Sequence, residues 1–189
     1  MPRVSGFRTL ISLLCLLVAA CSMRSAIESM TSPEDRAFAQ AMVDHLRRGD
    51  ESWLRQQFRP DLWDRSAKQI GGVPGLYPSV SGETEIVSFN TSTANVNGRV
   101  ERNRRFTLVT HGGGRWTVTT FATYSDGGPD QVVEWNVVPH NSPPPELTML
   151  ESFDAALPWI WGGLFAVLLA AGALIYWLVR RSRRIHVPK

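Results

Sequence analysis

The stretch RRFTLVTHGGGRWTVTTFATY, residues 104–124, decides the fold class of this 189-residue chain. Apolar and polar side chains alternate through most of residues 104–110 and of residues 115–124, which is the period of β-strands. The run His111-Gly112-Gly113-Gly114 between them supplies glycines, which accept the positive φ angles of a tight connection. The sequence therefore predicts two antiparallel strands joined as a hairpin.

One further strand is expected on each side of this hairpin. A strand beginning at residues 86–89 should bend and continue through Asn95 and Val96 to a turn at Asn97-Gly98. Residues 132–138 (VVEWNVV) form the last strand, after the turn residues SDGGP at 125–129. Consecutive strands joined by short turns predict an antiparallel meander of about four strands.

Helical signals precede the strands. Ser32 is an expected N-cap with Pro33 in the first turn, and residues 47–49 (RRG) supply a basic last turn and a glycine stop. Two shorter helices are expected at residues 51–58 and from Pro60. Helices followed by strands predict an α+β fold, with one face of the sheet packed on the first helix. The apolar stripe of that helix consists of Phe38, Ala41, Met42, His45 and Leu46.

This order of elements resembles the nuclear-transport-factor-2-like or cystatin-like superfamily. The resemblance covers residues 32–139, and its most characteristic part runs from Phe106 to Val118, where Trp116 comes directly after the hairpin. It implies N-terminal helices packed on a curved antiparallel sheet, often with a pocket. Members of the group serve as enzymes, ligand carriers or protein-binding modules, and the fold alone does not choose among these uses.

The N-terminal residues have the features of a bacterial export signal. Arg3 and Arg8 precede the apolar run LISLLCLLVAA at residues 10–20, which is short for a membrane span. Residues 18–21 (VAAC) resemble the lipobox of bacterial lipoproteins, which implies that Cys21 becomes the acylated, palmitate-bearing N-terminus. The alternatives are an ordinary signal peptide and an uncleaved helix with a buried cysteine.

Residues 157–179 (LPWIWGGLFAVLLAAGALIYWLV) are uncharged and long enough to cross a hydrocarbon core of ~30 Å. Arginines follow at residues 180–184, which places the C-terminus in the cytoplasm by the positive-inside rule. A buried helix of a globular core is the alternative. Gly162, Ala166 and Ala170 recur every four residues and predict a face for another helix, although such spacing also arises by chance in spans rich in small residues.

The charge distribution explains the net charge of +3. Seven of the 20 basic side chains lie before residue 22 or after residue 179, whereas all 17 acidic side chains lie between these limits. The basic excess therefore indicates membrane topology rather than a nucleic-acid partner. The only two cysteines are Cys15 and Cys21, so the expected soluble domain has neither a disulfide nor a thiolate metal site.

No motif in the chain fixes a chemistry. The four histidines lack metal-ligand spacing, and the chain has no nucleophile elbow, phosphate loop or dinucleotide fingerprint. Asp44 and Glu134 would have to meet in a pocket to act as in ketosteroid-isomerase-like relatives, and nothing in the sequence brings them together. His45 is more simply a core or rim residue. We therefore expect no catalytic residue, no metal and no cofactor.

Arg99, Arg102, Arg104 and Arg105 cluster around the predicted Asn97-Gly98 turn. The simpler interpretation is a solvated strand edge that charge protects from pairing with another strand. The alternative is a surface for an acidic partner or a lipid headgroup.

These features divide the chain into six expected segments. The segments are a lipoprotein signal peptide (1–20), a lipidated tether (21–31), a periplasmic α+β domain (32–139), a Pro-rich juxtamembrane linker (140–156), a transmembrane helix (157–179) and a basic cytoplasmic tail (180–189).

The two expected anchors favour different membranes. Ser22, directly after the lipidated cysteine, would favour release to the outer membrane in enterobacterial sorting. The C-terminal helix should nevertheless hold the protein in the inner membrane.

The expected function is that of a membrane-anchored periplasmic interaction module. It would be an accessory, assembly or scaffolding subunit of an inner-membrane protein complex, because an enzyme acting on a diffusing substrate gains little from two anchors. The expected partners are membrane lipids and that complex, without nucleic acid. The alternative is a small-molecule-binding or minor enzymatic domain with a nuclear-transport-factor-2-like pocket.

Overall fold

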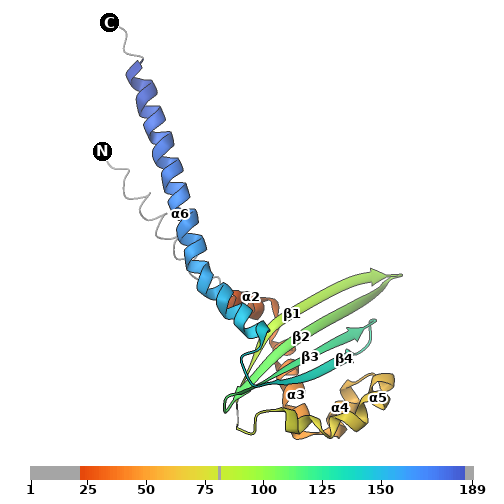
Figure 1. Ribbon diagram of the computed structural model, residues 1–189. Coiled ribbons are helices and arrows are strands. Elements are labelled where there is room, and N and C mark those ends of the chain that lie inside the picture. The colour runs from red at the N-terminus through yellow and green to blue at the C-terminus, as the bar shows by residue number, and fades with distance from the viewer. Residues whose placement is uncertain (1–21, 81, 186–189) are drawn as a thin grey trace. The chain divides into compact units, whose positions relative to one another are not determined.

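The computed structural model describes residues 22–80 and 82–185, so the predicted signal peptide and Cys21 lie outside the described residues. The chain divides into two units, which we describe separately (Figure 1). Met23–Glu151 forms a folded unit with helices and an open four-stranded antiparallel sheet, and the other unit includes the long apolar helix from Ser152 onward. The predicted α+β class is confirmed.

The longest helix of the folded unit is α3, Pro33–Arg48, and its ends are those that the sequence predicts. The Ser32 side chain accepts a hydrogen bond from the backbone N–H of Asp35 at 3.1 Å, which satisfies one free donor of the first turn. Gly49 ends the helix in the left-handed conformation, with φ of 64°. The buried face of α3 consists of Ala39, Met42, Val43 and Leu46.

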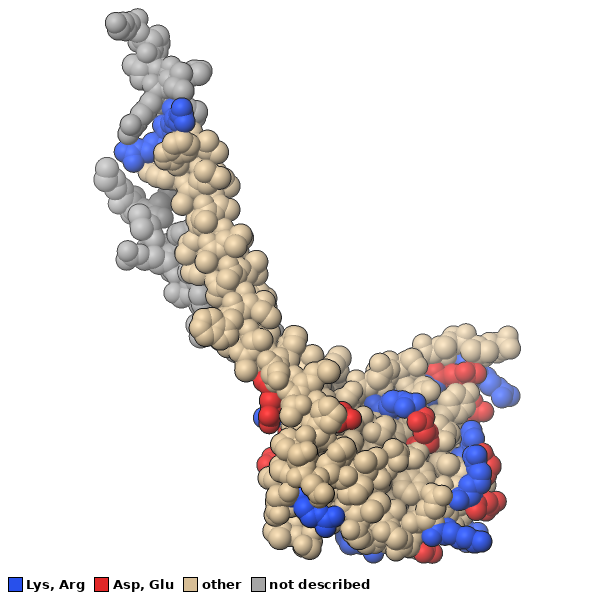
Figure 2. Space-filling model, in the orientation of Figure 1, with Lys and Arg blue, Asp and Glu red and all other residues tan. Residues whose placement is uncertain are grey.

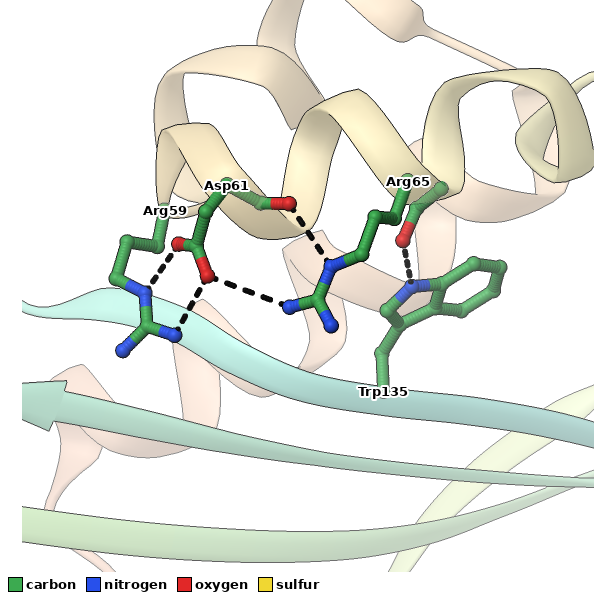
Figure 3. Close-up of polar contacts among 5 residues, drawn as sticks. Arg59, Asp61, Arg65 and Trp135 are labelled. Atoms are coloured by element: carbon green, nitrogen blue, oxygen red, sulfur yellow. Dashed lines mark hydrogen bonds and ion pairs between the residues drawn. The ribbon is translucent and has the colours of Figure 1, made fainter.

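Two short helices follow, α4 at Glu51–Gln57 and α5 at Pro60–Ile70, and a 3₁₀ turn η1 spans Val73–Leu76. Both predicted short helices are confirmed. The indole N–H of Trp135 donates a hydrogen bond to the Ser66 hydroxyl at 2.9 Å, which joins α5 to the last strand (Figure 3). In Figure 1, helices α3, α4 and α5 lie on one side of the sheet, which we call the helix side.

The sheet has the predicted meander order β1-β2-β3-β4. Its strands are β1 at Glu83–Val96, β2 at Arg99–Gly112, β3 at Arg115–Ser125 and β4 at Gln131–His140. The turns between β1 and β2 and between β2 and β3 each consist of two residues with positive φ, as two-residue hairpins require. Two histidines are placed differently from the prediction, because His111 belongs to β2 rather than to the turn and His140 belongs to β4 rather than to the linker.

The core lies between α3 and the helix side of the sheet. The strand register aligns Phe89, Phe106, Phe121 and Trp135 as one row across all four strands. The rings of Phe106 and Phe121 stack with centroids 4.9 Å apart, and Phe38 of α3 meets Phe121 edge-on at 6.0 Å. This row therefore couples the helix to every strand, as the predicted packing requires.

The opposite side of the sheet, which we call the outer side, is partly covered by a helix that the sequence analysis missed. Helix α2, Met23–Met30, packs on β1, with Ile27 buried and Arg24 paired with Glu85 at 2.9 Å. The expected tether thus contains a packed helix. It escaped prediction because its first turn has no acidic residue and its last turn no basic one.

The long C-terminal helix α6 runs without a break from Pro145 to Ile185. Its stretch Pro145–Leu178 is a candidate membrane span by length and composition, with a mean hydropathy of 1.9 in its most apolar window. Figure 2 shows its uncharged surface between acidic residues near its beginning and arginines near its end. Part of the predicted Pro-rich linker packs on the folded unit, since Pro144 and Leu150 are buried there.

Candidate functional site

The space between α3 and the sheet is filled by the protein's own side chains. Met42, Leu46, Phe106 and Phe121 are completely buried there. On this side of the sheet, the Tyr77 hydroxyl is hydrogen-bonded to that of Thr119 at 2.7 Å, and the Thr117 hydroxyl donates to the carbonyl of Leu76 at 2.7 Å. Burial raises the pKa of Tyr77 to about 12, so this phenol stays protonated. The described residues thus occupy the place where the family resemblance implied a ligand pocket.

Asp44 and Glu134 are not brought together. Asp44 is exposed on α3, on the helix side of the sheet. Glu134 accepts two hydrogen bonds from the Arg105 guanidinium, at 2.6 and 3.1 Å, and the register places this pair on the outer side. Since the sheet separates the two carboxylates, they do not form an acid–base pair.

His45 has the structural role expected of a rim residue. Its Nδ1 lies 2.8 Å from a carboxylate oxygen of Asp50, and its ring stacks on Trp53 with centroids 4.1 Å apart. Asp50 also caps α4, and hydrogen bonds from Ser52, from the Trp53 N–H and from His45 lower its pKa. This network joins the end of α3 to the start of α4 and leaves no free base.

A pocket of about 350 Å³ lies on the outer side, at the end of the sheet next to the β2–β3 turn. The His111 ring stacks on Trp116 with centroids 4.9 Å apart and forms one wall. Among the described residues, no group of three His, Cys, Asp or Glu side chains is arranged to hold a metal ion. The pocket is lined by Arg24, Glu83, Glu85, Val109, His111, Trp116, Pro143, Leu147 and Glu151.

Of the four arginines singled out in the sequence, Arg104 belongs to the fold. Its side chain is only 13% exposed and points to the helix side, where it is paired with Asp35 of α3 and with Asp130 of the β3–β4 connection. Arg105, on the outer side, is paired with Glu134. Neither guanidinium is therefore free to bind a partner without losing an existing ion pair.

The other two arginines have no ion-pair partner in the part of the chain that the structure describes. Arg99 and Arg102 are exposed, and neither takes part in an ion pair among the described residues. The neighbouring acid, Glu101, lies close to Tyr124 and, after burial, is the next cause of that residue's raised pKa. Because residues alternate between the two faces of a strand, Arg99 lies on the outer side and Arg102 on the helix side.

The strand order shows which of these arginines lie near an edge of the sheet. Strand β2 pairs with β3 as far as Arg102, so Arg104 and Arg105 lie in an interior strand. Arg99 comes before this point, where β2 pairs only with β1 and has a free edge, so edge protection stays a prediction for it. On β1, the residues from Ser88 to Val96 carry no charge.

The small residues Gly162, Ala166 and Ala170 lie in α6 and are exposed along it. Toward the end of this helix, the Arg181 guanidinium lies 5.2 Å from the centre of the Trp177 ring. An aromatic residue followed by cations is typical of the boundary of a membrane span.

Comparison with protein-family models, with curated proteins and with solved structures finds no match for this chain. The function must therefore be argued from the geometry of the described residues. Two features of the folded unit are not used by the core: the pocket beside Trp116 and the far half of the β1–β2 hairpin. We call the second feature, Asn90–Arg102, the distal hairpin.

Proposed function

We propose that this chain is a membrane-anchored interaction module, serving as an accessory, assembly or scaffolding subunit of an inner-membrane protein complex. The observation that carries the proposal is the distal hairpin. Each of its residues from Asn90 to Val100 is exposed, and its arginines Arg99 and Arg102 form no ion pair with any described residue. An ordered ribbon that adds nothing to the core is well suited to contact another molecule.

We also propose that α6 anchors the module in the inner membrane, with its arginine end in the cytoplasm and the folded unit in the periplasm. The uncharged stretch of α6 supports a span, and Arg180 and Arg181 at its end support the orientation. A second anchor on Cys21 is part of the same proposal, and the VAAC sequence supports it. Two such attachments would hold the module durably at the membrane.

The finer assignment of the fold to the cystatin-like type belongs to this proposal. Its support is the packing of one long helix, α3, across a four-stranded antiparallel meander, with Trp116 directly after the central hairpin. The filled core favours a protein-binding member of such a group over one with an internal ligand pocket.

Purification of the full chain in a mild detergent tests the proposed function. Native mass spectrometry should detect a complex that contains this chain and at least one other membrane protein. A variant whose distal hairpin is shortened by deletion of residues 93–96 and 99–102 should lose that complex while keeping its fold, whereas Arg115→Gln, at an exposed arginine outside the distal hairpin, should keep it. A chain that emerges alone under all mild conditions would contradict the proposal.

A second candidate function is small-molecule binding at the outer pocket. The observation that favours it is an aromatic wall, Trp116 stacked on His111, beside the carboxylates Glu83 and Glu151. This combination suits an organic ammonium ion. Titration of the full chain with choline should shift the methyl signals of Val109 and Leu147, and an unchanged spectrum at millimolar choline would exclude this class of ligand.

A further inference from the structure

The two edge strands of the sheet, β1 and β4, differ in how they are protected from pairing with another strand. Part of the β4 edge is paired with the segment between α4 and α5. The backbone N–H of Arg59 donates to the carbonyl of Val132 at 3.0 Å, and Phe58 forms a parallel bridge with the same residue. Pro139 removes one donor further along β4. This edge therefore offers a short and interrupted row of hydrogen-bonding groups.

The near half of the β1 edge is protected by other means. A register shift between Ile86 and Ser88 marks a bulge, and bulges disturb pairing with an incoming strand. Glu83 and Glu85 add charge, and α2 packs on the strand. Three of the usual protections of an edge strand thus occur on this half: a bulge, charged side chains and a packed helix.

The far half of the same edge, Asn90–Val96, has none of these protections. Its sequence NTSTANV contains no charge and no proline, the register is regular, and every residue is exposed. Backbone N–H and C=O groups on this edge point alternately toward β2 and away from it. The outward groups form a ready template for one more strand.

The distal hairpin also extends beyond the rest of the sheet, as Figure 1 shows. The last pair between β2 and β3 is Arg102 with Ser125, whereas β1 and β2 stay paired up to Val96 and Arg99. The final part is thus a two-stranded ribbon. An isolated ribbon of this kind is marginally stable in water, and a third strand would stabilise it.

Charge selects the kind of strand that fits. Arg102 lies opposite Thr93 on the helix side, and Arg99 lies opposite Val96 on the outer side. A strand added to β1 would lie about 10 Å from β2, which is two strand spacings. An extended arginine of β2 and an acidic side chain of the added strand can together bridge this distance. A second copy of this chain would instead bring two more unpaired arginines to the same place.

We infer that the distal edge of β1 binds an extended acidic segment of a partner protein by β-strand addition. This inference rests on the proposed function and deepens it by naming the chemistry of the partner. Backbone hydrogen bonds along Asn90–Val96 supply the affinity, and Arg99 and Arg102 select negative side chains on both faces of the added strand.

The test uses the full chain in detergent micelles and a synthetic peptide of about nine residues in which pairs of glutamates follow pairs of threonines, so that both faces of the added strand carry glutamate. Amide signals of Asn90–Val96 should shift on titration. Two matched peptides serve as controls: one replaces glutamate with lysine, and the other carries N-methyl groups on alternate residues, which blocks strand pairing on one edge. Both should bind at least about tenfold more weakly.

Charge reversal in the protein provides the complementary measurement. The double variant Arg99→Glu, Arg102→Glu should bind the acidic peptide at least about tenfold more weakly and should prefer the lysine peptide. Arg115→Glu, which changes an exposed arginine outside the distal hairpin, should leave the affinity unchanged.

Three results would overturn the inference. One is equal binding of the acidic, basic and N-methylated peptides, and another is no binding of the acidic peptide at millimolar concentration. The third is a disulfide-linked homodimer through residue 93 in a Thr93→Cys variant, because a second copy would then occupy the edge.

If the charge-reversal variant still co-purifies with a membrane complex, this inference fails while the proposed function stands. A chain that always emerges alone fails the proposed function instead.

Discussion

The two halves of the β1–β2 hairpin share one continuous ladder but have opposite surroundings. In the near half, Phe89, Phe106 and Leu108 are buried against helices and neighbouring strands. In the far half, from Asn90 to Val100, every residue is exposed. The two strands are therefore paired in both halves, with one register shift in the near half, and only the near half is held by a core. One pair of strands can thus support the core at one end and leave the other end exposed for the proposed recognition.

The largest expected effect is in the near half. Phe106→Ala removes a fully buried ring from the row that joins all four strands and should lower the free energy of unfolding by about 3–5 kcal/mol. Urea unfolding of the full chain, followed by tryptophan fluorescence, measures this loss. The matched change in the far half, Val100→Ala, should stay within about 0.5 kcal/mol. Equal losses would break the comparison.

Arg104 and Arg102, two residues apart on β2, lie on either side of the boundary between the two halves and give a second contrast. Arg104→Gln leaves Asp35 and Asp130 without their cation, and the free energy of unfolding should fall by about 2–3 kcal/mol. Arg102→Gln removes a free, exposed cation and should change it by less than about 0.5 kcal/mol. Thermal unfolding of both variants measures these two changes in stability. A destabilised Arg102→Gln variant would show that the far half supports the fold.

The buried phenol of Tyr77 predicts a pH effect on the core. Its pKa is raised to about 12 in the folded state, mainly by burial, against about 10 in an unfolded chain. The stabilisation is therefore complete below pH 10 and is lost as pH rises toward 12, by about 1.4 kcal/mol at pH 11 relative to neutral pH. Urea midpoints between pH 8 and 11 measure the decline, and Tyr77→Phe should flatten it. A wild-type curve as flat as that of the variant would refute this assignment.

Much of the fold could be predicted because the signals are local. Ser32, Pro33 and Gly49 each satisfy backbone requirements of a helix end within a few residues, so α3 begins and ends where the sequence indicates. Asn97-Gly98 likewise has the positive φ angles of a two-residue turn. Side-chain alternation then fixed the strands on either side.

The remaining features depend on contacts between distant residues. Helix α2 has no capping charges, and only its packing on β1 makes it visible. Leu150 is buried by the folded unit although the prolines before it indicate a spacer. Whether an arginine near a hairpin protects an edge depends on which strand lies outermost, and pairing across the sheet decides that. Pairing across the sheet likewise brings Arg104 next to Asp35 and Asp130, whereas it brings no acidic partner among the described residues to Arg99.

The most direct test of the account is a shortened hairpin. Deleting residues 93–96 and 99–102 lets Asn97-Gly98 join Ser92 to Asn103, which already face each other in the native register. Each deletion removes an even number of residues, so the side chains keep their faces. We expect the full chain to keep its free energy of unfolding within about 0.5 kcal/mol and to lose its membrane-protein partner in mild detergent. An unfolded variant, or a folded one that keeps the partner, would contradict the account.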